Sequence, residues 1–239
     1  MFFVFIFCKI KMVKEIIFDL ETTGLDYTKD AIIQYTFLNY QTDEYISGYV
    51  NPQRPMTKEA SDITGVTDID LKEYQPFSNH VEKILNFIGK EKETYLIAHN
   101  GDRFDKLFLS AALLSCGKSL SPFWKFIDTL KLYRHFFPEY PQHTMDFLRE
   151  KMNLTTKNNH SAAKDVFDLS LLYHDLRKNH NVKTLFDISF HFINFGKYKG
   201  EDFRNIPKDY LDFLIQRKIY LTNPDLLCYL QQYFPKAIV

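Results

Sequence analysis

The feature that most constrains this chain is an apolar strand that ends in two acids. The strand covers residues 14–20 (KEIIFDL), which are rich in β-branched and aromatic side chains and lead into a turn at Thr23-Gly24, so we expect it to be buried. Side chains alternate along a strand, which puts Asp19 and Glu21 on one face. Carboxylates this close repel each other, and burial increases the cost. A divalent cation would remove that cost; the simpler alternative is that Glu21 opens the turn and faces water.

The order of the expected elements predicts the fold class. Two further strands are expected at residues 31–39 and 44–50, and the short polar link between them predicts an antiparallel hairpin. The later expected elements are helices at 77–89, 103–116, 129–136, 144–152 and 161–177, and strands at 94–98 and 124–128. Three strands followed by alternating helices and strands predict an α/β fold, in which helices pack on both faces of a mixed sheet.

A change in composition near residue 194 predicts a second, smaller unit. Gly196 and Gly200 mark a turn there, and Pro207 stands at the start of a helix. The chain is therefore expected to contain a main domain at residues 12–180, a partly helical linker at 181–193 and a small C-terminal module at 194–239.

The N-terminal run and the cysteines bear on cellular location. Residues 1–8 (MFFVFIFC) are apolar, but a membrane span needs roughly 20 such residues, and the basic leader and cleavage site of a signal peptide are missing. Because Met12 precedes a more natural start, we expect residues 1–11 to be an optional or mis-assigned extension. The three cysteines show no paired spacing, which predicts neither a disulfide framework nor a zinc site. We expect an intracellular protein, cytoplasmic or nuclear, without membrane attachment.

Two of the expected helices carry acids among their apolar positions. On the helix at 161–177, Asp165 falls inside the apolar stripe and Asp168 lies toward its edge. Asp105 has a similar place near the start of the helix at 103–116. A carboxylate on a core-facing stripe is costly unless it is paired or bound to a metal. The alternatives are a buried salt bridge for Asp165 and, for Asp105, the favourable position of an acid in a first helical turn.

Four carboxylates and one histidine therefore form a candidate site. His160 lies five residues before Asp165; it is a candidate general base because histidine titrates near neutral pH, although a surface histidine is the simpler reading. Hard oxygen ligands favour Mg²⁺ or Mn²⁺ over zinc. Two such ions about 4 Å apart can cleave a phosphodiester bond, one by generating the attacking hydroxide and the other by stabilising the leaving 3′ oxygen. The expected cofactors are two Mg²⁺ or Mn²⁺ ions.

Three segments resemble the motifs of one nuclease superfamily. FDLETTGL (residues 18–25), AHNGDRFDKLFL (98–109) and HSAAKD (160–165) resemble, in the same order, the three motifs of the DEDDh 3′→5′ exonucleases. The resemblance covers roughly residues 13–177 and implies a ribonuclease-H-like fold with a mixed five-stranded sheet. It also implies attack from the 3′ end. The positions it implies are the metal ligands Asp19, Glu21, Asp105 and Asp165, and the general base His160.

Within that superfamily, the second motif and SDITGV (residues 61–66) resemble the three-prime repair exonucleases, and exonuclease X and polymerase proofreading subunits are more distant. The resemblance implies contacts with the terminal nucleotides, with Leu25 as an apolar wedge against the last base. The residues implied are Thr22, Thr23, Leu25, Ile63, Asn100 and Phe104. Ordinary packing is the alternative for Ile63 and Phe104.

The C-terminal segment FGKYKG…NIPKDYLDFL resembles a module appended to some exonuclease-X-like proteins. Its residues Lys197, Tyr198 and Lys199 place basic and aromatic side chains on one turn. Such a turn is suited to contact nucleic acid, and a solvated turn is the alternative.

The leading functional prediction is a metal-dependent 3′→5′ exonuclease that cuts phosphodiester bonds at DNA 3′ ends and releases nucleoside 5′-monophosphates. Its expected partner is single-stranded nucleic acid or a frayed 3′ end, with DNA favoured by the resemblance to repair enzymes. The alternatives are an exoribonuclease of the same fold, a proofreading subunit of a DNA polymerase and a catalytically silent binding module. The presence of all the catalytic positions argues against the last of these. The net charge of zero argues against a tight non-specific binder, and a dimer is compatible with the resemblance without any sign of one in the sequence.

Overall fold

The strand that carries the two acids lies at the centre of a five-stranded sheet of order β3-β2-β1-β4-β5. The structure, a computed structural model, describes residues 13–154 and 161–238. Its strands are β1 (Lys14–Thr22), β2 (Ile32–Asn39), β3 (Tyr45–Tyr49), β4 (Thr94–Ala98) and β5 (Trp124–Asp128). Strand β2 is antiparallel to β1 and β3, whereas β4 is parallel to β1 and β5. The predicted α/β class with a mixed sheet is confirmed.

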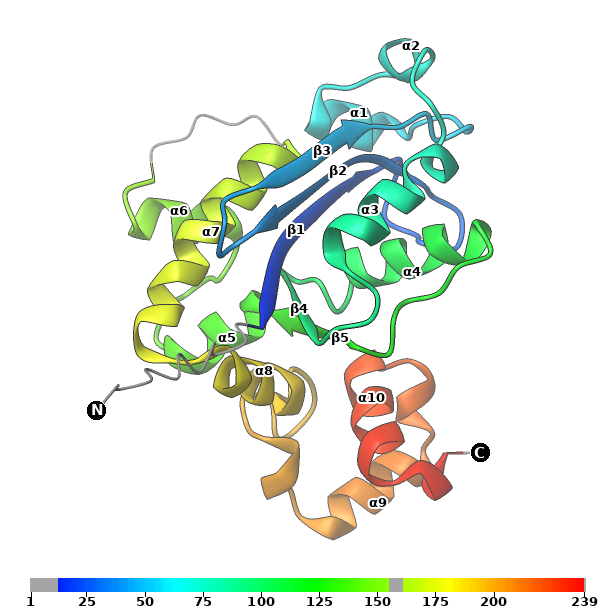
Figure 1. Ribbon diagram of the computed structural model, residues 1–239. Helices are drawn as coiled ribbons and strands as arrows, with labels where there is room; N and C mark the ends of the chain where they lie inside the picture. The colour runs from blue at the N-terminus through cyan, green and yellow to red at the C-terminus, as the bar shows by residue number, and fades with distance from the viewer. Residues whose placement is uncertain (1–12, 155–160, 239) are drawn as a thin grey trace, which may run out of the picture.

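Helices cover both faces of this sheet. Their bounds are α1 (Lys58–Thr64), α2 (Asp68–Leu71), α3 (Val81–Ile88), α4 (Asp105–Ser115), α5 (Thr129–Phe136), α6 (Met145–Lys151), α7 (Ala162–Asn179), α8 (Val182–His191), α9 (Lys208–Gln216) and α10 (Pro224–Tyr233). Short 3₁₀ turns occur at Phe77–Asn79, Phe203–Asn205, Ile219–Leu221 and Pro235–Ala237. Helices α3 and α4 pack on one face, and α5, α6 and α7 pack on the other (Figure 1).

The alternation of side chains along β1 separates two cores. Phe18 and Leu20 are buried with α3 and α4, whereas Ile17 is buried with α5, α6 and α7. Burial of each such side chain stabilises the fold by about 1.5–3 kcal/mol. Asp19 and Glu21 follow Ile17 at intervals of two, so their carboxylates belong to the α7 face of the sheet.

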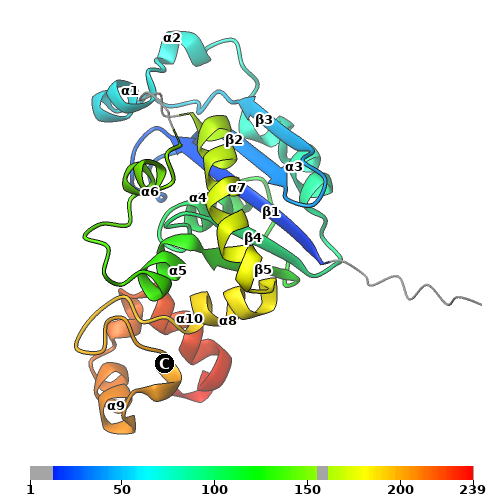
Figure 2. The same cartoon turned by 90° about the vertical axis from the view of Figure 1, so that its left-hand side faces the viewer.

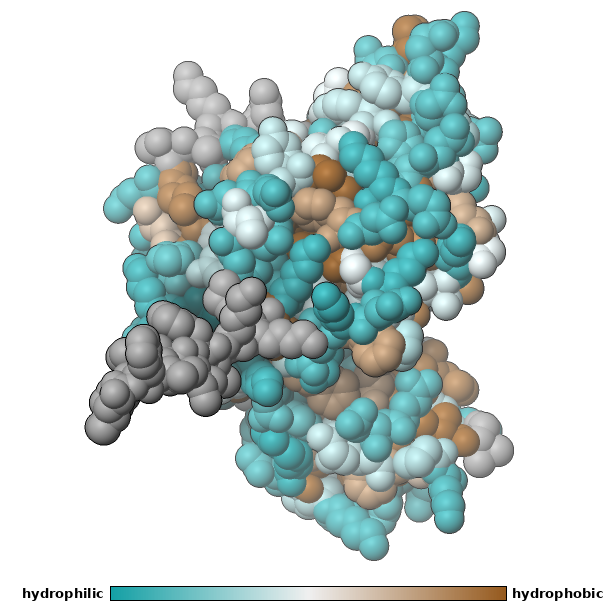
Figure 3. Space-filling model, in the orientation of Figure 1, coloured by the Kyte–Doolittle hydropathy of each residue, from teal (hydrophilic) through white to brown (hydrophobic). Residues whose placement is uncertain are grey.

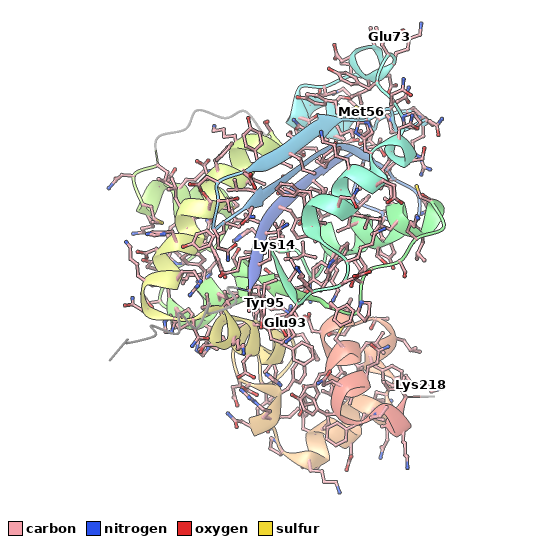
Figure 4. The ribbon with its side chains drawn as sticks, in the orientation of Figure 1. Lys14, Met56, Glu73, Glu93, Tyr95 and Lys218 are labelled. Atoms are coloured by element: carbon pink, nitrogen blue, oxygen red, sulfur yellow. The ribbon has the colours of Figure 1, made fainter. Side chains whose placement is uncertain are left out.

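Four of the strands end at the same edge of the sheet. Because β3 is antiparallel to β2, and β2 is antiparallel to β1, strand β3 runs in the same direction as β1, β4 and β5. We call the edge where these strands end the carboxyl edge. In Figure 4, Lys14 and Tyr95 mark the opposite edge, and Met56 lies beyond the end of β3. In α/β proteins of this kind, ligands bind outside the carboxyl ends of the strands.

The C-terminal residues form a third cluster of buried side chains, which includes Ile193, Phe203, Leu214 and Leu230. Helix α8 occupies most of the predicted linker and packs against β5 and α5. Figure 2 shows α1, α6 and α5 following one another down the carboxyl edge, with the C-terminal helices below them. The predicted domain boundaries stay predictions, and the predicted extension at residues 1–11 lies outside the described residues.

The visible surface is mainly polar. Figure 3 shows hydrophilic residues over most of one face, with apolar residues gathered between α3 and α7. Within residues 13–154 and 161–238, no helix has the length and apolar character that crossing a membrane requires. Among the exposed large apolar side chains, Leu25 and Ile63 are 85% and 57% exposed, and both belong to segments at the carboxyl edge.

Candidate active site

Three carboxylates meet at the carboxyl edge. Oxygens of Asp19, Glu21 and Asp165 all lie within 4.8 Å of one another. The first two come from β1, and Asp165 lies in the first turn of α7. The backbone N–H of Ala162 donates to Oε1 of Gln34 at 3.2 Å, and Gln34 pairs with Glu21 in the sheet. This hydrogen bond holds the first turn of α7 beside the two acids of β1.

Burial and mutual repulsion raise the pKa values of this cluster. Loss of hydration, followed by the charges of Asp105, Glu21 and Asp165, raises the pKa of Asp19 well above its usual range. Burial, and then the charge of Asp165, raises the pKa of Glu21 to about 7. Clustered oxygen donors that repel one another are what a hard divalent cation stabilises. The donor set therefore fits a divalent metal ion.

Asp105 approaches these acids from the other face of the sheet. It is the first residue of α4, it is buried, and its Oδ1 accepts a hydrogen bond from the backbone N–H of Leu20 at 3.1 Å. Burial is the main cause that raises the pKa of Asp105 to about 8, with further contributions from Asp128 and Glu21. The group of carboxylates within 4.8 Å does not include Asp105, so its role as a metal ligand stays a prediction.

Arg149 on α6 is a site residue that the sequence did not indicate. Its buried guanidinium donates to Asp165, to Oδ2 of Asp168 at 2.8 Å and to Oδ1 of Asp146 at 2.9 Å. The helical stripe predicted that Asp165 is more deeply placed than Asp168, but Asp168 is the buried one and Asp165 is only partly buried. The salt-bridge alternative thus applies to both acids, because one arginine lies between them.

Asp128, the last residue of β5, is a second residue that sequence reasoning missed. Its Oδ1 accepts the backbone N–H of Asn100 at 2.9 Å, and burial raises the pKa of Asp128 to about 7. Asn100 has a left-handed φ of 60°, and a Cβ on Gly101 would lie 2.6 Å from Cβ of Ala98. Asp128 therefore fixes the tight loop that leads into α4 and Asp105.

The residues predicted to contact the terminal nucleotide differ in exposure. Leu25 and Ile63 are exposed, as a contact surface requires. Thr22 and Thr23 are buried, and their hydroxyls donate to the carbonyl of Gly24 at 2.6 Å and to Oδ1 of Asp30 at 3.0 Å. Both threonine side chains therefore shape the turn, and their predicted contact with the terminal nucleotide stays a prediction.

Phe104 and His160 complete the predicted set. Phe104 caps α4, is partly buried against the core and packs on Phe108 with 4.8 Å between ring centroids, so packing accounts for its position. The backbone N–H of Thr57 donates to the carbonyl of Thr23 at 2.9 Å; this bond ties the start of α1, and thus Ile63, to the end of β1. His160 lies outside the described residues, so its role as the base stays a prediction.

A protein-family model described as an exonuclease matches residues 16–173. The chain therefore belongs to this exonuclease family, and the resemblance predicted from the motifs is confirmed. The matched range contains all four predicted metal ligands, the whole of α4 and most of β1 and α7.

Curated relatives are much longer than this chain. The PolC-type DNA polymerase III of Bacillus subtilis is 32% identical over 156 residues, which are 63% of this chain and 10% of the polymerase. The corresponding polymerase of Listeria welshimeri is 29% identical over 188 residues, which are 77% of this chain and 12% of the polymerase. The chain thus spans about a tenth of the length of these relatives.

Solved exonuclease structures share the fold. A zinc-bound complex of E. coli exonuclease I with single-stranded DNA matches with a TM-score of 0.65 and 18% identity, covering 74% of this chain and 42% of that one. Exonuclease X in complex with 5′ overhanging duplex DNA matches with a TM-score of 0.56 and 21% identity, covering 73% of this chain and 99% of that one.

Proposed function

We propose that this chain is a metal-dependent 3′→5′ exonuclease that releases nucleoside 5′-monophosphates from DNA 3′ ends. The observation that carries the proposal is the approach of Asp19, Glu21 and Asp165 within 4.8 Å at the carboxyl edge, in a chain of the exonuclease family. Asp19, Glu21, Asp105 and Asp165 would hold two Mg²⁺ or Mn²⁺ ions, for which carboxylate oxygens are suitable ligands. When bound, such ions supply positive charge to the phosphodiester group.

The side chains of the protein have separate tasks in this reaction. Water attacks the terminal phosphorus, the bond to the 3′ oxygen of the preceding nucleotide breaks, and the last nucleotide leaves with its 5′ phosphate. His160 would accept the proton of the attacking water. Arg149 would keep Asp165 in position by donating to it.

DNA is the polymer that the comparisons favour. The relatives are DNA polymerases, and the structures of similar fold contain single-stranded DNA or duplex DNA with a 5′ overhang. These complexes support a single strand or a frayed 3′ end as the substrate. The polymerase relatives also favour a second candidate, a proofreading role on a polymerase partner.

The proposal is tested with 3′-labelled and 5′-labelled single strands of DNA and of RNA, incubated with Mg²⁺ or with EDTA. We expect Mg²⁺-dependent release of mononucleotides from the 3′ end of DNA. The proposal fails if neither polymer is shortened, and faster trimming of RNA would replace it with the exoribonuclease alternative. Addition of a replicative polymerase with a mismatched primer tests the proofreading role, which requires faster removal of the mismatched nucleotide in the polymerase's presence.

Substitutions test the proposed site itself. Asp19→Ala and Asp165→Ala should abolish turnover while circular dichroism shows an intact fold. His160→Ala should lower the rate by about 10²–10⁴-fold, the usual contribution of a general base. Turnover in either aspartate variant would refute the metal site, and a normal rate for the histidine variant would remove that residue from the mechanism.

A further inference from the structure

A groove of about 740 Å³ lies between the end of β4 and the C-terminal turn. It is formed by residues after β4, by α5 with the loop that follows it, and by the turn around residue 199. The lining residues that matter here are His99, Asn100, Arg134, Tyr140, Phe192 and Lys199. We call this cavity the basic groove.

The basic groove lies at the same edge of the sheet as the candidate active site. Ile97 of β4 pairs with Ile17 of β1, so Asn100 lies beyond the end of β4 at the same edge where Asp19 and Glu21 leave β1. The predicted contacts of the terminal base are on the β3 side of these acids, because Ile63 belongs to α1, which follows β3. The basic groove lies on the opposite side, toward β5. A strand whose last nucleotide contacts Ile63 would therefore leave the acids in the direction of the groove.

The charge of the groove suits a polyanion. Arg134 and Lys199 line it, and none of its lining residues is Asp or Glu, although acids and bases are equal in number in the whole chain. Within the described ranges, neither cation forms an ion pair. Burial lowers the pKa of His99 to about 4, so this histidine adds no charge at neutral pH. Tyr140 and Phe192 also line the groove. Phe192 is buried, whereas Tyr140 is partly exposed, and an aromatic ring beside cations is typical of single-strand binding surfaces.

The turn that carries Lys199 is fixed relative to the main domain. The N–H of Gly200 donates to the carbonyl of Ile193 at 2.8 Å, and the N–H of Ile193 donates to the carbonyl of Glu201 at 2.9 Å. Between the two units, Nζ of the buried Lys131 lies 2.7 Å from Oδ1 of Asp225 on α10, and within the main domain it lies 2.6 Å from Oδ2 of Asp102. These contacts hold the module, and with it the Lys199 turn, against the loop that precedes α4.

We propose that the basic groove binds the substrate strand on the 5′ side of its terminal nucleotides, and that Lys199 makes the C-terminal module part of the substrate-binding surface. Arg134 and Lys199 neutralise backbone phosphates there. This inference rests on the proposed function, because it takes the substrate to be a nucleic-acid strand that ends at the acids.

Two substrates separate binding along the strand from chemistry at its end. One is a single-stranded oligonucleotide of about twelve nucleotides, which falls within the range of single-strand site sizes. The other is the p-nitrophenyl ester of thymidine 5′-monophosphate, which has no upstream nucleotide. Arg134→Glu and Lys199→Glu should each raise KM for the oligonucleotide by about tenfold. Each should also reduce the magnitude of the slope of log affinity against log salt concentration by about 0.7, which is the value for one phosphate contact on a single strand. Hydrolysis of the ester should be unchanged.

Lys218→Glu is the matched control, because Lys218 is an exposed cation of the same module that does not line the groove and stands at the outer side of the module in Figure 4. It should leave KM for the oligonucleotide and the salt slope unchanged. An unchanged KM in both groove variants would overturn the inference, as would an equal loss on the ester. If the wild-type protein hydrolyses neither substrate, the proposed function is refuted. Fluorescence anisotropy of a labelled oligonucleotide then tests binding to the groove by itself. Equal binding by the wild-type protein and all variants would reject the groove as a binding site.

Discussion

Nε of Arg149 lies 2.8 Å from Oδ2 of Asp168, and this contact joins α6 to α7 close to Asp165. The same guanidinium reaches Asp165 itself. One positive charge is thus held beside the acids of the candidate site, and it opposes the rise in the pKa of Asp19 that burial and the neighbouring acids cause. The arginine therefore supports both the helix packing and the placement of one acid.

Arg149→Met should lower the free energy of unfolding by about 3–5 kcal/mol, because it leaves the buried Asp168 without its counter-charge. Urea unfolding measures this change. The matched control is Asp146→Ala, which removes the solvent-exposed partner of the same arginine and should cost at most about 1 kcal/mol. Equal losses of unfolding free energy in the two variants would show that the buried pair of Arg149 and Asp168 stabilises the fold no more than the exposed pair of Arg149 and Asp146.

Stability without metal should decrease as the pH rises from acid to neutral. The pKa of Glu21 is raised from 4.5 to about 7, and that of Asp105 from 3.8 to about 8. At pH values between the usual pKa and the raised pKa of each acid, the folded state binds more protons than the unfolded state. The free energy of unfolding therefore falls as the pH rises through this window. Denaturant unfolding at several pH values in EDTA measures the slope.

Mg²⁺ should weaken this pH dependence, because a bound cation stabilises the ionised carboxylates. Glu21→Gln, which removes one titrating group, should also flatten the curve. If the free energy of unfolding in EDTA rises across the same pH window, Glu21 and Asp105 do not have raised pKa values in the folded protein.

Leu25→Ala and Ile63→Ala should alter substrate binding rather than folding. Both side chains are exposed, so their removal should change stability by no more than about 0.5 kcal/mol. Burial of a Leu or Ile side chain against a base is worth about 1.5–3 kcal/mol, which corresponds to a KM raised about ten-fold or more. Leu114→Ala on α4 is the control, since Leu114 is 63% exposed and is not among the residues predicted to contact the terminal nucleotides. If both test variants have the KM of the wild-type protein, Leu25 and Ile63 do not contact the substrate.

Lys131→Met should destabilise the protein by about 3–5 kcal/mol, because it leaves the buried Asp225 without its cation. Although burial raises it, the pKa of Asp102 is held below its usual value by Lys131 and Lys106. Limited proteolysis should then release the C-terminal module more readily. Lys125→Met, which removes the partly exposed pair with Glu93, should have little effect, and equal protease resistance of the two variants would argue against a link through Lys131.

The sequence predicted those parts of the site that lie on a regular repeat. Asp19 and Glu21 stand out because a strand with a period of two ends in acids, and Asp165 stands out because it interrupts an apolar helical stripe. The topology also follows from the sequence, since the hairpin and the later alternation of strands and helices allow few arrangements.

The partners of these acids could not be predicted in the same way. Arg149 meets Asp168 across two helices, Asp128 holds the backbone of a loop, and Lys131 joins two clusters of helices. Each contact depends on which residue of one element faces a residue of another, and no periodicity within one segment contains that information. Phe104 illustrates the same limit, because only the packing on Phe108 distinguishes a core ring from an exposed one.

The candidate site draws on β1 and on α7, which are far apart along the chain. Chains are made from the N-terminus at about 5–20 residues per second, so Asp165 follows Asp19, 146 positions earlier (165 − 19), after about 7–29 s. During that interval the growing chain on the ribosome has only part of its nuclease centre. The three clustered carboxylates can come together only after α7 has emerged and packed against β1 and β2.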